Sequence, residues 1–175
     1  MDKKTLRKEM LKKRLSLSEG FIENASRKIC NKIRRMEEYR DAKTVALYFP
    51  IKNEVRILQL MKDKTKKFLL PRLEKERLVF APFNSFEELK KGRFGIPEPI
   101  SPKWKEKIDV IIVPALAFSP KKHRLGYGKG YYDKFLKKFN PFKIGVCFDF
   151  QVRHFAHEEH DAVMDAVVTE KRVIV

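Results

Sequence analysis

The sequence predicts a single α/β domain with a mostly parallel central sheet that is flanked by helices and preceded by N-terminal helices. Three observations predict this fold. Short apolar runs alternate with helical segments, and several of these runs are apolar at consecutive positions without alternating polar residues. No repeat, linker or low-complexity stretch interrupts the 175 residues. Strands that are buried on both faces have continuous apolar runs, and strands that alternate with helices favour a parallel sheet. We therefore assign residues 1–175 to one domain.

Two helices are expected at the start of the chain. Residues 3–15 have helical periodicity with Leu6, Met10 and Leu11 on one side, and Ser18 is a suitable N-cap for a second helix. The second segment has an apolar residue at mostly four-residue spacing, which predicts a helix face that packs on the core. These apolar positions are Phe21, Ala25, Ile29, Ile33 and Met36.

The rest of the chain alternates apolar runs with helical segments. The runs that indicate buried strands cover residues 44–50, 66–73, 77–83, 109–118, 143–148 and 165–175. Helices are expected near 54–64, at 85–91, where Ser85 and Glu88 fit a capping box, and at 131–139. This alternation predicts parallel strands that are joined by crossover helices.

The chain is strongly basic. It has 40 Lys and Arg residues against 23 Asp and Glu residues, for a formal net charge of +17. This charge fits a nucleic-acid surface, the attraction of polyanionic small molecules such as nucleotides, or the Lys- and Glu-rich composition of proteins from hot environments. Because the usual aromatic or helix-turn-helix recognition patterns are not evident, no nucleic-acid partner is expected.

The composition also favours a cytoplasmic protein without membrane association, and we expect a monomer. No apolar run approaches the ~20 residues that span a bilayer, and the charged N-terminus MDKKTLRKEM lacks the apolar core of a signal peptide. Cys30 and Cys147 form no CxxC pair, and Cys147 lies in an apolar run where a thiol packs as a small hydrophobic group. We expect neither cysteine in a disulfide or a metal site.

The segment HRLGYGKGYYDKF, residues 123–135, holds three of the seven glycines within five residues, between a predicted strand and a predicted helix. Alternating glycines let the backbone turn its N–H groups toward an anion at the helix N-terminus, and Arg124 and Lys129 add positive charge. A phosphate is the simplest ligand. The spacing GxGxG matches neither GxGxxG nor GxxxxGK[ST], and a tight connection that needs glycine for its geometry is the alternative.

Several acidic and histidine side chains have two readings. Asp133 is either a favourable partner of the helix dipole or a carboxylate that reaches a Mg²⁺ ion carried by nucleotide phosphates. Asp161, four residues before another acid, could be a surface charge of a helix. His154, His157 and His160 are spaced by three, but on a helix the outer two lie ~240° apart and would not converge on one metal ion.

The loop sequence RLGYGKGYYD, residues 124–133, resembles the signature of the 5-formyltetrahydrofolate cyclo-ligases, also called 5,10-methenyltetrahydrofolate synthetases. Further segments are similar to this family in the same order along nearly the whole chain. They are KKTLRKEM at 3–10, YFPIKNEV at 48–55, LLPR at 69–72, GIPEP at 95–99, DVIIVPALAF at 109–118 and HDAVMDAVVTE at 160–170. The resemblance implies an α/β enzyme that uses ATP and Mg²⁺ to close 5-formyltetrahydrofolate to 5,10-methenyltetrahydrofolate, through a phosphorylated formyl intermediate, with release of ADP and phosphate.

The resemblance also implies which residues bind ATP. The matching positions are Lys3, Lys4, Thr5, Leu6 and Arg7, and Arg124, Leu125, Gly126, Tyr127, Gly128, Lys129, Gly130, Tyr131 and Tyr132. Arg7 is the leading candidate among the first five, because a guanidinium can hold phosphate oxygens with two donors. Arg72 is a further candidate, for phosphate or for the glutamate carboxylates of the folate. Since phosphoryl transfer needs positioning and charge neutralisation, we assign catalytic roles to Arg124, Lys129 and Tyr132.

Folate and metal positions are implied in the same way. The folate-binding positions are Phe49, Glu54 and Phe94, with Tyr127, Gly128, Lys129, Gly130 and Tyr131 of the loop, and the Mg²⁺ ligands are Asp133 and Asp161. Phe49 suits packing against the pterin or aminobenzoate ring, and Glu54 suits accepting hydrogen bonds from the pterin N–H edge. Phe94 stands where many members carry Trp, so it keeps an aromatic face but lacks the N–H donor.

A basic protein that binds RNA or another polyanion is the second class of function. In such a protein the glycine loop would hold phosphate without catalysis. Asp133 separates the two classes, because a carboxylate beside the loop repels phosphate unless a metal ion lies between them. The sequence therefore favours the ligase, with a reduced folate and ATP as its small-molecule partners.

Overall fold

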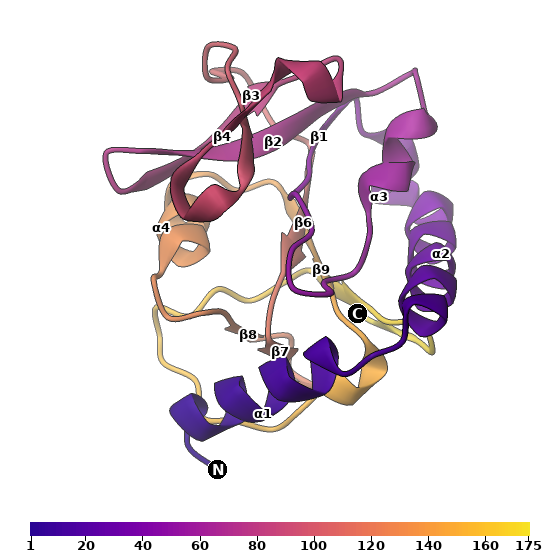
Figure 1. The fold of residues 1–175 in the computed structure, drawn as a ribbon, viewed down its shortest axis with the longest axis vertical. Helices are drawn as coiled ribbons and strands as arrows, with labels where there is room; N and C mark the ends of the chain where they lie inside the picture. Colours follow the sequence, from indigo (N-terminus) through magenta and orange to yellow (C-terminus); the bar gives the residue numbers. More distant parts are fainter.

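The computed structural model describes residues 1–175 and contains a seven-stranded sheet with the order β11-β10-β9-β6-β1-β2-β3 (Figure 1). Its five central strands run parallel: β10 (Ala166–Val168), β9 (Phe142–Val146), β6 (Val110–Pro114), β1 (Thr44–Ala46) and β2 (Lys67–Glu74). The edge strands β11 (Val173–Ile174) and β3 (Arg77–Pro82) pair antiparallel with their neighbours. The predicted α/β class and mostly parallel sheet are confirmed.

The chain has four α-helices, which are α1 (Lys3–Leu15), α2 (Glu19–Arg35), α3 (Glu37–Asp41) and α4 (Tyr131–Lys138). The Ser18 hydroxyl accepts a hydrogen bond from the Phe21 N–H and so caps α2, as predicted. The predicted stripe of α2 is wrong at its first position, because Ile22 is buried whereas Phe21 is 37% exposed. The buried residues of α2 are Ile22, Ala25, Ser26, Ile29, Cys30 and Ile33.

Two predicted helices are wrong in extent. Near 54–64 the structure has only the 3₁₀ segment η1 (Leu58–Lys62), and residues 85–91 contain the 3₁₀ turn η2 (Phe86–Glu88) followed by a short strand. Ser85 makes no capping bond, and the Glu88 carboxylate accepts instead from the Asn84 N–H at 2.9 Å. The remaining small elements are β4 (Leu89–Lys91) paired with β5 (Pro97–Pro99), β7 (Ala117–Phe118) paired with β8 (Arg124–Leu125), η3 (Arg93–Gly95) and η4 (Asp149–Gln151).

Different helices cover the two faces of the sheet. Val45 of β1 packs with α2, α3 and η1 on one face, and its neighbour Ala46 packs with Phe135 of α4 on the other. Consecutive strand residues point to opposite faces, so a strand buried on both sides needs a continuous apolar run. The three-layer arrangement therefore follows from the uninterrupted apolar runs of the central strands.

The first helix, α1, lies across the carboxyl end of the sheet (Figure 1). Leu6 and Met10 are buried against Leu116, Ala117 and Leu125, which follow the carboxyl end of β6. The basic face of α1 thereby lies near the carboxyl ends of the strands, where α/β proteins bind their ligands.

Both cysteines are free and buried, and the predicted packing of Cys147 among apolar residues is confirmed. Burial raises the pKa of the Cys30 thiol to about 12, so it stays protonated at neutral pH. No helix combines the length and the apolar character that crossing a membrane would require.

Candidate active site

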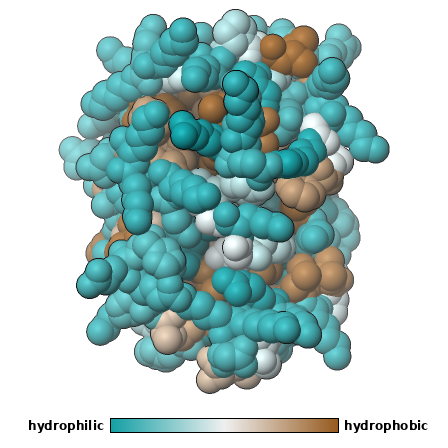
Figure 2. All heavy atoms as spheres, turned by 90° about the vertical axis from the view of Figure 1, so that its left-hand side faces the viewer, coloured by the Kyte–Doolittle hydropathy of each residue, from teal (hydrophilic) through white to brown (hydrophobic).

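A cavity of about 850 Å³ opens at the carboxyl end of the parallel strands. Its walls come from the segment after β1, strand β2, the η3 turn, the glycine loop 126–130, the start of α4 and the N-terminus of α1. Figure 2 views the side of the molecule on which α4 lies, where hydrophilic side chains surround a hollow with apolar atoms deeper in it. Basic lining residues outnumber acidic ones by nine to five, which favours an anionic ligand.

Arg124 is fixed in the cavity wall by two contacts. Its Nε donates to the Pro114 carbonyl at 2.7 Å, and its guanidinium carbon lies 4.7 Å from the centroid of the Tyr132 ring. The guanidinium passes directly over Gly126, where an added Cβ would lie 2.5 Å from Nη1. The loop therefore needs glycine at this position so that the arginine can approach the backbone closely.

Arg7 of α1 reaches the same loop from the opposite side. Its Nε donates to the Gly126 carbonyl at 2.8 Å, and its guanidinium lies beside Gly128. The backbone of Gly128 has a φ of 99°, which disfavours any residue with a side chain. Two guanidinium groups from distant parts of the sequence are thus brought to one short stretch of backbone.

The N-terminus of α4 completes this positively charged wall. Gly130 is its N-cap with a φ of 72°, and no side chain caps the helix. The first N–H groups of such a helix have no partner within it and carry partial positive charge, so they suit a phosphate. Lys129 is exposed immediately before the helix.

The two predicted metal-ligating carboxylates lie on the wall beside this helix. Asp133 Oδ1 accepts from the Ala162 N–H at 3.1 Å, which joins α4 to the residue after Asp161. Asp161 Oδ2 accepts from Lys3 Nζ and from the Glu158 N–H, both at 2.9 Å. Partial burial acts to raise the pKa of Asp161, but these hydrogen bonds outweigh it and the pKa lies below the usual value.

These two carboxylates suit Mg²⁺, which is commonly held by one or two protein carboxylates together with phosphate oxygens and water. No group of three or more His, Cys, Asp or Glu side chains is arranged as a metal site of its own. The segment that carries Asp161 and the three spaced histidines is not helical, so the helical geometry considered for it was wrong.

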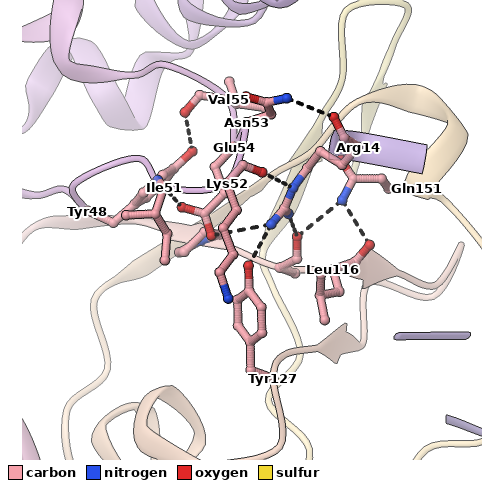
Figure 3. A network of polar contacts seen from close by, with 12 residues as sticks. Arg14, Tyr48, Ile51, Lys52, Asn53, Glu54, Val55, Leu116, Tyr127 and Gln151 are labelled. Atoms are coloured by element: carbon pink, nitrogen blue, oxygen red, sulfur yellow. Dashed lines mark hydrogen bonds and ion pairs between the residues drawn. The ribbon is translucent and has the colours of Figure 1, made fainter. Parts of the chain in front are cut away.

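Glu54 lies in the other half of the cavity and is 5% exposed. Its Oε2 accepts from the Ile51 N–H at 2.9 Å, and its Oε1 lies 3.9 Å from Nη2 of Arg14 (Figure 3). Burial raises the pKa of the Glu54 carboxyl, and the Arg14 guanidinium is the strongest influence in the opposite direction. An acid placed here can accept hydrogen bonds from a ligand that enters the cavity.

Aromatic side chains line the same cavity as Glu54. Tyr48 is buried and Phe49 is partly buried, directly after β1. Phe94 lies in the η3 turn at the cavity wall, is 67% exposed and has a φ of 63°. Aromatic surface beside a hydrogen-bonding acid suits a flat heterocyclic ligand.

Most of the predicted site residues lie together in this cavity. Those that line it are Lys3, Arg7, Phe49, Glu54, Arg72, Phe94, Arg124, Leu125, Gly126, Tyr127, Gly128, Lys129, Gly130, Tyr131, Tyr132, Asp133 and Asp161. The structure does not bring Lys4, Thr5 or Leu6 to it: Leu6 is in the core, and Thr5 bonds to the N-cap Asp2. The Arg72 guanidinium already donates to the Pro99 and Ser101 carbonyls.

Sequence reasoning missed Arg14, which is 1% exposed and binds Tyr127 of the glycine loop (Figure 3). A signal was available. Leu6, Met10 and Arg14 are spaced by four, so the arginine continues the buried face of α1. A charged residue at the end of an apolar helix stripe indicates a buried polar contact.

Comparisons with known proteins show the family of the chain. The profile of the 5-formyltetrahydrofolate cyclo-ligase family matches residues 1–170. A 5-formyltetrahydrofolate cyclo-ligase from Mycoplasma genitalium is 34% identical over 96% of this chain and 98% of its own length. The corresponding protein of Mycoplasma pneumoniae is 31% identical, over 98% of this chain and 100% of its own.

Solved structures are similar over almost the full length as well. The 5,10-methenyltetrahydrofolate synthetase of Aquifex aeolicus superimposes with a TM-score of 0.89 at 38% identity, covering 99% of this chain and 92% of its own. The synthetase of Mycoplasma pneumoniae gives a TM-score of 0.80 at 28% identity, covering 97% and 99%. With its α/β fold and the glycine loop at the carboxyl end of the sheet, the chain belongs to the 5-formyltetrahydrofolate cyclo-ligase family.

Proposed function

We propose that the protein catalyses the ATP- and Mg²⁺-dependent cyclisation of 5-formyltetrahydrofolate to 5,10-methenyltetrahydrofolate, with release of ADP and phosphate. One observation carries the proposal: a single cavity joins an anion-binding wall, with Arg7, Arg124 and the α4 N-terminus, to a recess that holds the buried acid Glu54. A nucleotide and a reduced folate are ligands of these two kinds, and family membership points to the same pair.

The first step activates a poor leaving group. The formyl oxygen on N5 attacks the γ-phosphorus of ATP, a new O–P bond forms, and the bond to ADP breaks. Charge on the transferred phosphoryl oxygens is best neutralised by donors that are already in place. Arg124 is held by Pro114 and Tyr132, and Arg7 is held by Gly126, so both guanidinium groups are ordered before ATP arrives.

The second step closes the ring. N10 attacks the activated formyl carbon, the N10–C bond forms, and the C–O bond to phosphate breaks. N10 loses its proton, and the former formyl oxygen leaves in the phosphate. In this proposal the departing phosphate is stabilised by Lys129, which is exposed just before α4, and by the N–H groups at the start of that helix.

Asp133 and Asp161 would hold Mg²⁺, which supplies further charge neutralisation on the phosphates of ATP. Each carboxylate keeps one oxygen that has no backbone partner, since Asp133 uses Oδ1 and Asp161 uses Oδ2 for N–H groups of the protein. Lys3, which bonds to Asp161, adds a cation at the same place.

Folate recognition is assigned to Glu54 and its aromatic surroundings. Glu54 accepts from the N–H edge of the pterin, and Phe49 packs against a ring of the folate. Phe94 is exposed at the mouth of the cavity and covers the ligand from outside. Tyr127 lies between the two halves of the site because it belongs to the glycine loop and contacts Arg14, the neighbour of Glu54.

The test is the near-ultraviolet absorbance of the methenyl product. Purified protein is mixed with 5-formyltetrahydrofolate, Mg²⁺ and ATP, and the control mixture lacks ATP. The proposal expects an ATP-dependent rise, which the Asp133→Asn variant reduces sharply. No rise with folded protein that still binds ATP would reject the reaction, and tight binding of RNA instead would support a polyanion-binding protein.

A further inference from the structure

Arg14 has the largest side chain among the fully buried residues, and the proposed mechanism does not use it. It is 1% exposed and does not line the cavity. A buried charge is costly unless its hydrogen bonds are satisfied, so the contacts of this guanidinium show what it is for.

The guanidinium makes four contacts with three segments of the chain (Figure 3). Nε donates to the Lys52 carbonyl at 2.9 Å, and Nη1 donates to the Ala115 carbonyl at 3.1 Å. Nη2 donates to the Tyr127 hydroxyl at 2.6 Å and lies 3.9 Å from Oε1 of Glu54. Two contacts thus hold backbone, and two hold side chains that line the cavity.

We propose that Arg14 is a positioning residue that fixes Glu54 and Tyr127 relative to each other, and so orients the substrate between the acid and the glycine loop. This inference rests on the proposed function, because it assigns Glu54 to the folate. Arg14 touches no ligand itself. Its planar, rigid guanidinium sets both partners with one group, which a lysine cannot do.

The contact with Tyr127 determines where the tyrosine hydroxyl points. The hydroxyl oxygen accepts from Arg14, so its own proton must be donated to another group. No protein atom accepts that proton, and Tyr127 is 39% exposed at the cavity. The hydroxyl is therefore set as a donor to the substrate, while Glu54 is set as an acceptor.

The contact with Glu54 favours the charged form of the acid. The groups that face its carboxylate are the cations Arg14, Arg124 and Lys52, the Ile51 N–H, and the phenols Tyr48, Tyr127 and Tyr132. Burial raises the pKa of Glu54 and Arg14 opposes this most strongly. Without Arg14 the pKa rises further, Glu54 is protonated at higher pH, and its ability to accept two N–H bonds is lost there.

Gln151 supplies a matched control for a purely structural role. It is also 1% exposed, and its Nε2 donates to the Ala115 carbonyl, the same acceptor that Arg14 uses, and to the Leu116 carbonyl. Its side chain makes no hydrogen bond with Glu54 or Tyr127 (Figure 3). Gln151→Met should therefore destabilise the same region without changing either cavity residue.

The test titrates Glu54 by carboxyl ¹³C NMR in the free protein and measures folate and ATP affinity by calorimetry across pH. In Arg14→Met we expect the pKa of Glu54 to rise by about one unit and folate binding at neutral pH to weaken about tenfold, with ATP binding changed less. In Arg14→Lys the charge is kept, so the pKa should return toward the wild-type value. Turnover of Arg14→Lys should still be low, because its contact with the Tyr127 hydroxyl is lost. Tyr127→Phe should lower turnover without changing the pKa of Glu54.

An unchanged pKa of Glu54 in Arg14→Met would overturn the proposal, as would an equal shift in Gln151→Met. If Arg14→Met does not fold, turnover of Arg14→Lys and Tyr127→Phe tests the proposal instead. Wild-type turnover in both variants would overturn the proposal, and reduced turnover in both would support it. The titration needs no substrate. A wild-type protein that forms no methenyl product would thus reject the proposed function and leave the link between Arg14 and Glu54 to be judged by the NMR result.

Discussion

The two ends of the parallel sheet use the same kinds of side chain for different purposes. At the amino end, Asp109 Oδ2 accepts from the N–H groups of Lys43 and Thr44, both at 2.9 Å, and Asp165 Oδ2 accepts from the Lys143 N–H at 2.7 Å. At the carboxyl end, Asp133 and its neighbours line a cavity of about 850 Å³. Carboxylates that accept hydrogen bonds from backbone N–H groups at the start of strands should stabilise the fold. Carboxylates that line the cavity should bind a ligand.

This comparison predicts opposite effects on activity and on stability at the two ends of the sheet. Substitutions at the carboxyl end should cost activity and change stability less, because these side chains face an open cavity. Substitutions at the amino end should do the reverse. Active sites commonly show this pattern, since groups that face a ligand are arranged for its charge and not for the stability of the empty protein.

Arg124→Met should give the largest effect. It removes a fixed positive charge from the proposed phosphoryl-transfer site, and loss of one such donor typically costs 10²- to 10³-fold in kcat. We expect a decrease of about 10³-fold, measured by the methenyl absorbance assay. Lys138→Met removes a charge from the last turn of α4, outside the cavity, and should keep wild-type turnover. Equal losses in the two variants would mean that net charge, and not the fixed guanidinium, is responsible.

Gly126→Ala should reduce activity next most strongly. The added methyl group would lie 2.5 Å from Nη1 of Arg124, so the guanidinium must move, although the loop backbone can stay. We expect about a 10- to 100-fold loss in kcat/KM for ATP with little change in Tm. Gly20→Ala is the control, because nothing lies within 4 Å of a Cβ there and alanine favours the helix. A large drop in Tm for Gly126→Ala would show instead that this glycine serves the fold.

The N-terminal helix offers a matched pair of smaller effect. Lys3 lines the cavity and bonds to Asp161 at 2.9 Å, whereas Lys4 is exposed and lies outside the cavity. Lys3→Met should raise the KM for ATP about five- to tenfold, and Lys4→Met should leave it unchanged. If both substitutions raise KM equally, the helix acts through its total charge and the assignment of Lys3 is wrong.

The difference between Lys3 and Lys4 also shows why part of the site could not be read from the sequence. A family resemblance marks a continuous stretch, Lys3 to Arg7, but a helix turns by ~100° per residue. Residues four apart share a face, so Lys3 and Arg7 reach the cavity while Leu6 faces the core. The glycine loop could be read from the sequence because its residues line the cavity consecutively, from Leu125 to Asp133.

The fold was predictable to a similar extent. Helix α1, the cap of α2 and helix α4 follow from local spacing, and these predictions are confirmed. The antiparallel edges and the β4–β5 pair depend on contacts between distant segments, which periodicity does not report. The role of Arg14 also depends on contacts between distant segments. Its position on the buried face of α1 could be predicted, but its four contacts come from other parts of the chain.

Asp109→Ala should have the smallest effect on activity and a clear effect on stability. Two strand N–H groups lose their acceptor, which we expect to cost about 2 kcal/mol in the free energy of unfolding. Burial acts to raise the pKa of Asp109, but the N–H groups of Thr44 and Lys43 outweigh it, so the pKa in the folded protein is below the usual value. A carboxyl with a lowered folded pKa contributes stability above its unfolded pKa of about 3.9 and loses it as pH falls through the folded pKa.

Urea unfolding of wild type and Asp109→Ala at several pH values therefore sharpens the comparison between the two ends. The gap in stability should be full at pH 7 and shrink as the pH falls below about 4, because only the wild type has this carboxylate to protonate. Asp41→Asn, an exposed acid at the end of α3, is the control and should show no such gap. Turnover of folded Asp109→Ala at 25 °C should match the wild type. A loss of turnover at unchanged stability would place a functional acid at the amino end and break the division between the two ends of the sheet.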